Sequence, residues 1–177
     1  MNSIVVNLIQ VRNRIELAAL AAKREPEEIE LLAVSKTFPA SAVEEAMHAG
    51  QSAFGENYVQ EGVHKVHALE DLRANIEWHF IGPLQSNKSR DVAENFDWVH
   101  SIDRLKIAQR LNDQRPSNLS RLNVCIQVNV SGESTKSGIH PNDALELCNS
   151  ISKMPNLLLR GLMSIPEPTE DIASQRK

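Results

Sequence analysis

The spacing of hydrophobic positions changes along the chain, and these changes predict an alternation of helices and strands. From Ser3 to Ala22, apolar residues recur every three or four positions, which predicts one long amphipathic helix that ends before Pro26. Short apolar runs then predict strands within LLAVSK, SAFGEN, IEWHFIG, DWVHSID, LNVCIQVNV and LLLRGLMSIP. Helical spacing lies between them, in SAVEEAMHAG, in VQEGVHKVHAL, from Ser86, in RLKIAQRLN and from Pro141 to Ile151. Such alternation is typical of βαβ units with a parallel sheet.

The first predicted strand is apolar throughout. Its residues Leu31 to Val34 form a continuous hydrophobic run, which predicts a strand that is buried on both faces by covering helices. The run stops on Lys36, and Pro39 soon follows. We therefore expect Lys36 at the carboxyl end of the strand, just before a turn.

Polar residues also follow the other predicted strands, and this favours a barrel over an open sheet. A (β/α) barrel places its functional residues at the carboxyl ends of its strands. The first strand-to-helix turn lacks the G-x-G-x-x-G pattern of dinucleotide-binding sheets. We predict an α/β fold of the TIM-type (β/α) barrel. The residues that support it are Lys36, Glu56, Asn57, Gly82, Ser101, Asp103, Asn129, Ser131 and Ser164.

The sequence predicts only about six of the eight strands that a closed barrel requires. At 177 residues with 41% hydrophobic content, we expect one domain over residues 1–177, an incomplete barrel. The first and sixth strands would then be open edges with apolar surface in water. We expect copies of the chain to associate through these edges, unless the sequence is part of a longer chain.

Composition narrows the function classes. The 19 basic and 23 acidic residues are interspersed and give a net charge of −4, which disfavours nucleic acid as a partner. No segment has the length or hydrophobicity of a membrane span or the pattern of a signal peptide. Cys125 and Cys148 share no metal-ligand spacing and suggest reduced thiols, although a disulfide between them stays open. We expect a cytoplasmic protein with no metal site.

Lys36 is the residue with the clearest chemical potential. When a lysine at a barrel rim is partly desolvated, its ammonium form is disfavoured and its amine can attack an aldehyde. The histidines suggest less. His64 and His67 lie one helical turn apart without a third ligand nearby, so we interpret them as surface residues. His79, between Trp78 and Phe80, is expected to be a hydrogen-bonded core residue.

Six motifs occur in order and together resemble one known family. They are AVSKTFP, FGENYVQE, WHFIGPLQSNK, VHSID, QVNVSGE followed by KSGI, and RGLMSIP. Over about Leu31 to Pro166 the chain closely resembles the pyridoxal phosphate homeostasis proteins, which are single-domain relatives of the alanine racemase amino-terminal barrel. The resemblance implies that Lys36 holds pyridoxal 5'-phosphate (PLP) as a Schiff base.

The resemblance also implies further cofactor-binding residues. Asn57 would lie beside the cofactor, and Met163 and Ser164 would help to line the mouth of the site. In the family, a seventh and an eighth strand supply the amides and hydroxyl groups that hold the phosphate, and the motifs of those strands do not occur in this sequence. We therefore expect this chain to hold PLP weakly through its phosphate.

Three functions stay open at this point. The resemblance implies a non-catalytic protein of PLP homeostasis that keeps the aldehyde out of solution and passes PLP to PLP-dependent enzymes. The alternative is a racemase or decarboxylase, but a racemase needs a base on each face of the substrate and only Lys36 is evident. The single tyrosine, Tyr58, is expected at the rim. The third alternative is a truncated family member without function.

Overall fold

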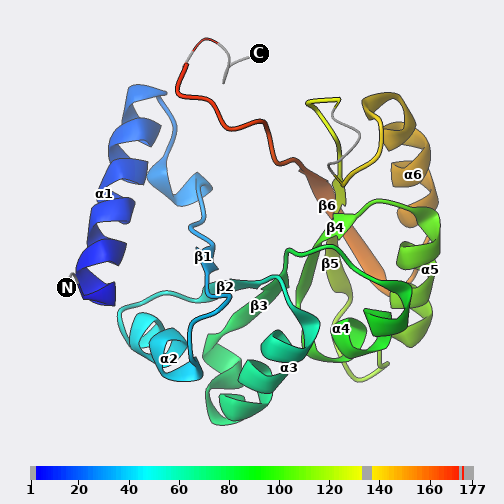
Figure 1. Ribbon diagram of the computed structural model, residues 1–177, viewed down its shortest axis with the longest axis horizontal. Coiled ribbons are helices and arrows are strands. Elements are labelled where there is room, and N and C mark those ends of the chain that lie inside the picture. Colours follow the sequence, from blue (N-terminus) through cyan, green and yellow to red (C-terminus); the bar gives the residue numbers. More distant parts are fainter. Residues whose placement is uncertain (1–2, 133–136, 172, 174–177) are drawn as a thin grey trace. The chain divides into compact units, whose positions relative to one another are not determined.

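The structure, a computed structural model, describes residues 3–132, 137–171 and 173. Contacts divide the chain into two compact units, residues 1–79 and 80–177, which are described one by one. The prediction of one domain over residues 1–177 stays a prediction. The alternation of helices and strands is confirmed, and the described residues form six strands (Figure 1). The chain therefore has an α/β fold.

The first unit contains three strands and three α-helices. Its strands lie in the order β1-β2-β3, and β1 pairs with β2 in parallel. The core forms around β2 and β3, where the buried rings of Phe54 and Trp78 lie 6.1 Å apart. The elements are α1 (Ile4–Ala21), β1 (Ala33–Val34), α2 (Ala40–His48), β2 (Ala53–Glu56), α3 (Val59–Ala68) and β3 (Glu77–Phe80), with 3₁₀ turns Pro26–Glu28 and Glu70–Asn75.

The long amphipathic helix predicted from Ser3 is confirmed as α1. The hydroxyl of Ser3 accepts a hydrogen bond from the Val6 N–H at 3.3 Å, which caps the first turn as expected for serine at this position. Only part of its apolar face is buried, and the buried residues are Leu8 and Ala19. Large apolar side chains of α1 are exposed at Val5, Val6, Ile9, Val11, Leu17 and Leu20.

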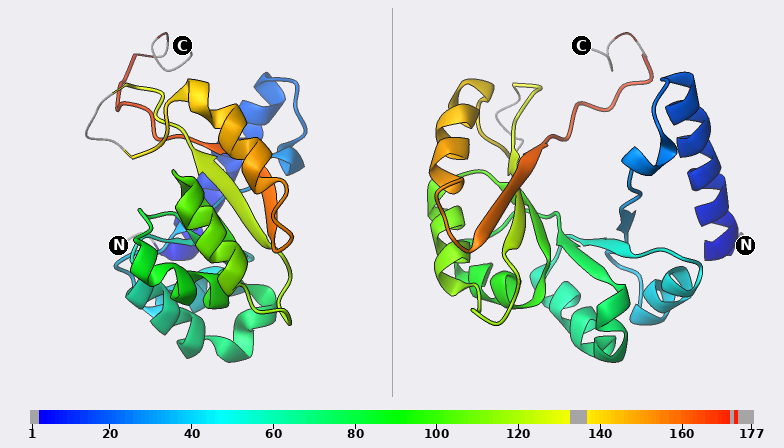
Figure 2. Two further views of the ribbon diagram at one scale, coloured as in Figure 1. Left: turned by 90° about the vertical axis from the view of Figure 1, so that its right-hand side faces the viewer. Right: turned by 180° about the vertical axis from the view of Figure 1, so that it is seen from behind.

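The second unit contains the parallel strands β4, β5 and β6, in this order. Helices α5 and α6 lie on one face of β5 and β6 (Figure 2). Fully buried residues such as Val124, Ile126 and Leu157 on the strands and Ile107 and Leu111 on α5 form its core. The elements are α4 (Ser89–Asn95), β4 (Trp98–Ile102), α5 (Leu105–Gln114), β5 (Leu122–Gln127), α6 (Ala144–Ile151) and β6 (Leu157–Met163), with 3₁₀ turns Ser86–Lys88 and Pro141–Asp143.

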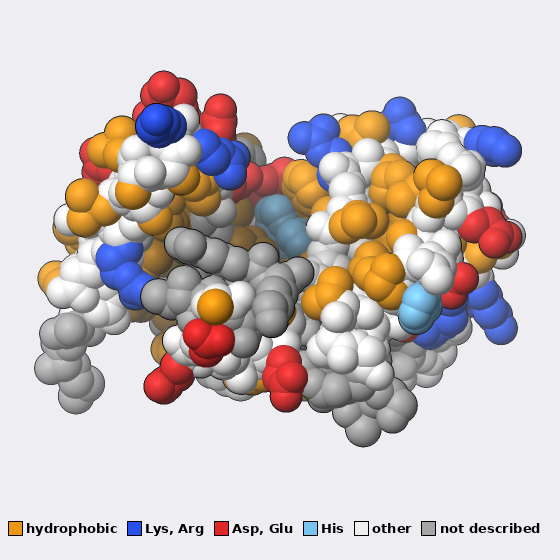
Figure 3. Space-filling model, turned by 90° about the horizontal axis from the view of Figure 1, so that it is seen from above, with side chains coloured by type: hydrophobic (Ala, Val, Ile, Leu, Met, Phe, Trp, Pro, Cys, Tyr) orange, Lys and Arg blue, Asp and Glu red, His pale blue; other side chains and the backbone are white. Residues whose placement is uncertain are grey.

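The first strand differs from its prediction. We expected a strand buried on both faces, whereas β1 contains two residues, of which Ala33 is half-buried and Val34 is 48% exposed. Within its unit β1 is an edge strand, with β2 as its strand neighbour. On β6, Leu162 is 59% exposed in the same way. Hydrophobic side chains are also visible at the surface in Figure 3.

Candidate functional site

Lys36 lies in a tight turn directly after β1. The Phe38 N–H donates to the Ser35 carbonyl at 3.1 Å, which makes Lys36 and Thr37 the two central residues of a β-turn. The Lys36 side chain is exposed, contrary to the expected partial burial, because it projects from a turn rather than from the strand. Within the described residues its amine has no hydrogen-bond or ion-pair partner, so it is available for reaction.

The backbone of this turn is strained at Thr37. Its φ of +67° lies in the left-handed region, which a β-branched residue rarely adopts. When the third residue of a β-turn has a positive φ, that residue is normally glycine or asparagine. Strain of this kind costs about 1–3 kcal/mol and persists only where neighbouring groups hold the conformation. The surroundings of Thr37 must therefore hold the turn.

Asn57 lies across from Lys36, at the end of the neighbouring strand. The parallel register pairs Val34 with Gly55, so Lys36 and Asn57 each follow this pair by two residues. The structure thus brings these two predicted residues to the same edge of the sheet. The Oδ1 atom of Asn57 is buried and has no hydrogen-bond partner among the described residues. This buried acceptor is therefore unsatisfied among the described residues.

A buried ion cluster includes the residues that directly precede Lys36 and Asn57, namely Ser35 and Glu56. The Lys65 ammonium on α3 donates three hydrogen bonds of 2.7 Å, to the Ser35 carbonyl and to Oε1 of Glu56 and of Glu61. The Ser35 hydroxyl donates to the same Glu56 oxygen at 2.7 Å. Lys65 is 3% exposed and Glu56 is fully buried, so these two opposite charges pair with each other inside the unit.

Glu61 connects this cluster to the strained turn. Its Oε1 atom also accepts a hydrogen bond of 2.6 Å from the Thr37 N–H. The hydrogen bond from Lys65 lowers the pKa of the Glu61 carboxyl below its ordinary value, against the opposing effect of burial and with help from the Thr37 N–H. Glu61 is therefore held as a carboxylate beside the turn.

Sequence reasoning did not identify Lys65 or Glu61. The available signal was their spacing, because residues four apart face each other on a helix. That spacing alone indicates an ordinary surface ion pair.

The remaining predicted site residues lie in the second unit. Met163 is the last residue of β6 and is half-buried, and Ser164 follows it and is exposed. Both lie at the carboxyl end of a parallel strand, as predicted. In the motif QVNVSGE followed by KSGI, Glu133 and Lys136 lie outside the described residues.

The structure confirms that His64 and His67 lie at the surface and that His79 is buried, whereas the expected hydrogen bond of His79 stays a prediction. His64 and His67 are exposed on α3. His79 is 4% exposed on β3, and its Nε2 atom lies 3.4 Å from Oε2 of Glu77. The described residues contain no group of three or more His, Cys, Asp or Glu side chains that could hold a metal ion.

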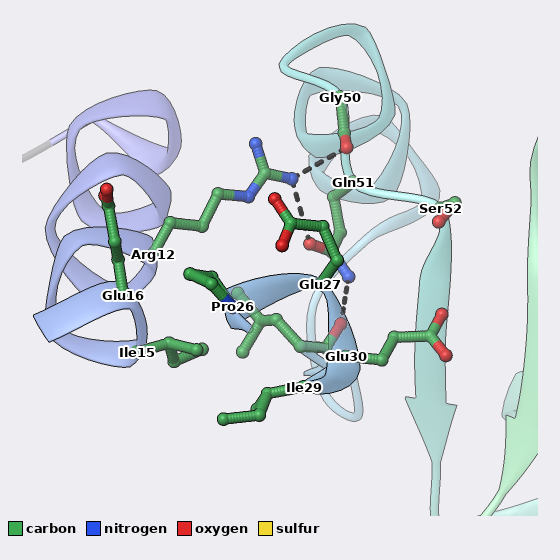
Figure 4. A pocket seen from close by; sticks show the side chains of 11 residues that line it. Arg12, Ile15, Glu16, Pro26, Glu27, Ile29, Glu30, Gly50, Gln51 and Ser52 are labelled. Carbon is green, nitrogen blue, oxygen red and sulfur yellow. Dashed lines mark hydrogen bonds between the residues drawn. The ribbon is translucent and has the colours of Figure 1, made fainter. Parts of the chain in front are cut away.

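A pocket of about 830 Å³ lies at the opposite end of the strands of the first unit (Figure 4). Arg12 of α1 crosses it and donates to the carbonyls of Ala49 and Gly50 and to Oε1 of Gln51. The Gln51 amide in turn donates to the Leu31 carbonyl at 2.6 Å. These polar groups are already paired, so the pocket joins α1 to the amino ends of β1 and β2. In barrels this end serves stability rather than chemistry.

The chain matches one family of known proteins over nearly its whole length. The family model for the alanine racemase N-terminal domain matches residues 6–176. The pyridoxal phosphate homeostasis protein of Escherichia coli is 59% identical over 176 residues, which cover 99% of this chain and 75% of that protein. The chain belongs to the pyridoxal phosphate homeostasis protein family.

Other members of the family agree in sequence and in structure. The Pseudomonas aeruginosa protein of this name is 58% identical over 175 residues, 99% of this chain and 75% of its own length. The PipY protein of Synechococcus elongatus, solved with PLP bound, is 38% identical with a TM-score of 0.72, over 91% of this chain and 73% of PipY. The predicted TIM-type barrel fold is thereby confirmed, with six strands in the described residues.

Proposed function

We propose that this protein binds PLP covalently through Lys36 and takes part in PLP homeostasis. The observation that carries the proposal is the exposed Lys36 amine, which has no partner among the described residues and projects from a turn held on both sides. PLP supplies an aldehyde carbon that is electrophilic toward amines. Lys36 would hold the group through its amine, which would act as the nucleophile toward this carbon and release one water molecule.

The residues of the first unit fit such a group. Asn57 offers a buried Oδ1 acceptor that has no partner in the described structure, at the same sheet edge as Lys36. Met163 and Ser164 are proposed to line the mouth of the site, since they end a parallel strand as Lys36 and Asn57 do. The family match over residues 6–176 supports the proposal that residues 1–177 act as one cofactor-binding domain.

We further propose that the protein carries PLP without catalysing turnover and passes it to PLP-dependent enzymes. The names of its relatives support a role in homeostasis. A racemase would need a second acid-base group, and the tyrosine that could serve, Tyr58, is 58% exposed at the start of α3. Release of D-alanine from L-alanine by the PLP-loaded protein would contradict this part of the proposal.

A cytoplasmic location is part of the same proposal. Cys125 and Cys148 are both free, so the disulfide that the sequence left open is not formed. Free thiols suit a reducing compartment. Among the described helices, none has the length and hydrophobicity needed to cross a membrane.

The test is covalent trapping on Lys36. The protein is mixed with PLP, its absorption spectrum is recorded, and borohydride then adds hydride to the carbon bound to nitrogen, so that peptide mapping locates the adduct. We expect the Lys36→Ala variant to lose the adduct and to keep its stability within about 0.5 kcal/mol, because an exposed side chain contributes little packing.

A matched control replaces another exposed lysine. Lys106 lies on α5 in the second unit, and Lys106→Ala should trap PLP on Lys36 as the unmodified protein does. An adduct retained in Lys36→Ala, or adducts spread evenly over exposed lysines, would overturn the assignment of Lys36.

A further inference from the structure

Stability alone is a poor explanation for the charged cluster that Lys65, Glu56 and Glu61 form. A buried ion pair is rarely a large source of stability, because desolvation of the two charges offsets their attraction. Here one ammonium lies between two carboxylates, and the Oε2 atom of Glu56 has no partner among the described residues. An apolar set of side chains would fill the same space without these costs. We therefore infer that the cluster serves to position the backbone groups that it binds.

Its hydrogen bonds end on the backbone on both sides of Lys36. The Lys65 ammonium binds the carbonyl of Ser35, the residue before Lys36. The Glu61 carboxylate binds the N–H of Thr37, the residue after it. The amine of Lys36 itself receives none of these contacts. The cluster thus fixes the turn and leaves the reactive group free.

The strained residue is the one that Glu61 holds. Thr37 has a φ of +67°, which its branched side chain disfavours, and its N–H lies 2.6 Å from the Glu61 oxygen. A charged acceptor forms a stronger hydrogen bond than a neutral one and can offset strain of this kind. Glu61 in turn has its carboxylate fixed by Lys65, four residues later on α3.

We propose that Glu61, oriented by the buried Lys65, is a positioning residue that holds Thr37 in its left-handed conformation and thereby presents the amine of Lys36. This inference rests on the proposed function, since the presentation of Lys36 matters only if Lys36 binds the cofactor. Glu61 binds the backbone of the turn and would affect cofactor binding only through the position of Lys36.

The first measurement needs no cofactor. Hydrogen exchange of the Thr37 amide is followed by NMR in the unmodified protein, in Glu61→Ala and in Glu61→Gln. Loss of a hydrogen bond to a charged group should lower the protection of this amide about tenfold in Glu61→Ala. Glu61→Gln keeps an oxygen acceptor and should lose less. The control, Glu94→Ala, removes the exposed pair between Arg90 and Glu94 on α4 and should leave Thr37 unchanged.

The second measurement is a rescue. Glycine adopts positive φ at no steric cost, so Thr37→Gly should form the turn without help from Glu61. With PLP and borohydride as the probe, Glu61→Ala should label Lys36 about tenfold more slowly than the unmodified protein, in line with the loss of that hydrogen bond. The double variant with Thr37→Gly should recover most of this rate. Labelling of Lys106 in the same samples serves as the internal reference.

Unchanged protection of Thr37 in Glu61→Ala would overturn the inference, and so would slow labelling that Thr37→Gly does not restore. Failure of the proposed function has a different signature. In that case Lys36 is not labelled preferentially even in the unmodified protein, while the exchange measurement still decides whether Glu61 holds the turn. Glu61→Gln also guards against a variant that does not fold, because its side chain has the same shape.

Discussion

Among the described residues, each unit buries one lysine or arginine that binds backbone carbonyls, and these two cations lie at opposite ends of their strands. Lys65 in the first unit binds the Ser35 carbonyl, which follows β1. Arg115 in the second unit donates to the carbonyls of Ala93 and Phe96, which precede β4, and of Ser120, which precedes β5. Lys65 therefore fixes a strand-to-helix turn, whereas Arg115 fixes the helix-to-strand connections.

The difference separates stability from function within one architecture. In (β/α) barrels the carboxyl ends of the strands carry the chemistry and the amino ends serve stability. Arg115 at an amino end satisfies carbonyls of the helix-to-strand connections. Lys65 at a carboxyl end holds the turn that carries Lys36, and we propose that it thereby helps to present the Lys36 amine. Two buried cations of similar burial, 3% and 8% exposed, can thus have different roles.

The largest expected effects come from replacing each cation with methionine. Lys65→Met leaves the buried Glu56 carboxylate without a counterion and should lower the free energy of unfolding by about 3–5 kcal/mol. Arg115→Met leaves carbonyls unpaired and should cost about 3 kcal/mol. In protein that remains folded, only Lys65→Met should also slow PLP labelling of Lys36. Equal slowing in both variants would remove the contrast between the two ends.

Urea denaturation can follow the two units separately, because the chain has two tryptophans, one in each unit. Trp78 lies in the first unit and Trp98 in the second. Replacing one of them with phenylalanine leaves a fluorescence signal that reports on the other unit. Lys65→Met should shift the Trp78 transition more than the Trp98 transition, and Arg115→Met should do the reverse.

A smaller effect is expected from acid. The pKa of Glu61 is lowered from its ordinary value of 4.5 in the folded protein, so Glu61 binds a proton more readily in the unfolded chain. Its contribution to stability is then fully present above pH 4.5 and is lost as the pH falls through the lower, folded pKa. Urea denaturation of the protein and of Glu61→Gln should show a stability difference at neutral pH that disappears in acid. A difference independent of pH would contradict this assignment.

The smallest effect concerns the edge strands of the two units. We expect copies of the chain to associate through β1 and β6, where Val34 and Leu162 are exposed. Val34→Thr and Leu162→Thr should each weaken association by about 1 kcal/mol, as measured by sedimentation over a range of concentrations. Leu145→Thr, at a residue that is 72% exposed on α6, is the matched control. A monomer at all concentrations would exclude association.

Periodicity was sufficient to predict the elements, because each strand and helix presents its own apolar pattern to a core. It failed at β1, where Val34 is 48% exposed, since an apolar run indicates burial only where other elements cover both faces of the strand. Lys36 and Asn57 were predicted to end adjacent strands, and the register confirms it. The cluster around Lys65 was missed because a charged helix residue gives no sign in the sequence that it is buried.

The shortness of β1 has a consequence for dynamics. A strand of two residues contributes few ladder hydrogen bonds, and among the contacts that hold the following turn are those from the side chains of Lys65 and Glu61. Segments with few such contacts open locally at a lower free energy than the core. We expect the segment that carries Lys36 to be the part of the first unit that opens first. A ligand bound covalently there would then stabilise the weakest segment of its own binding site.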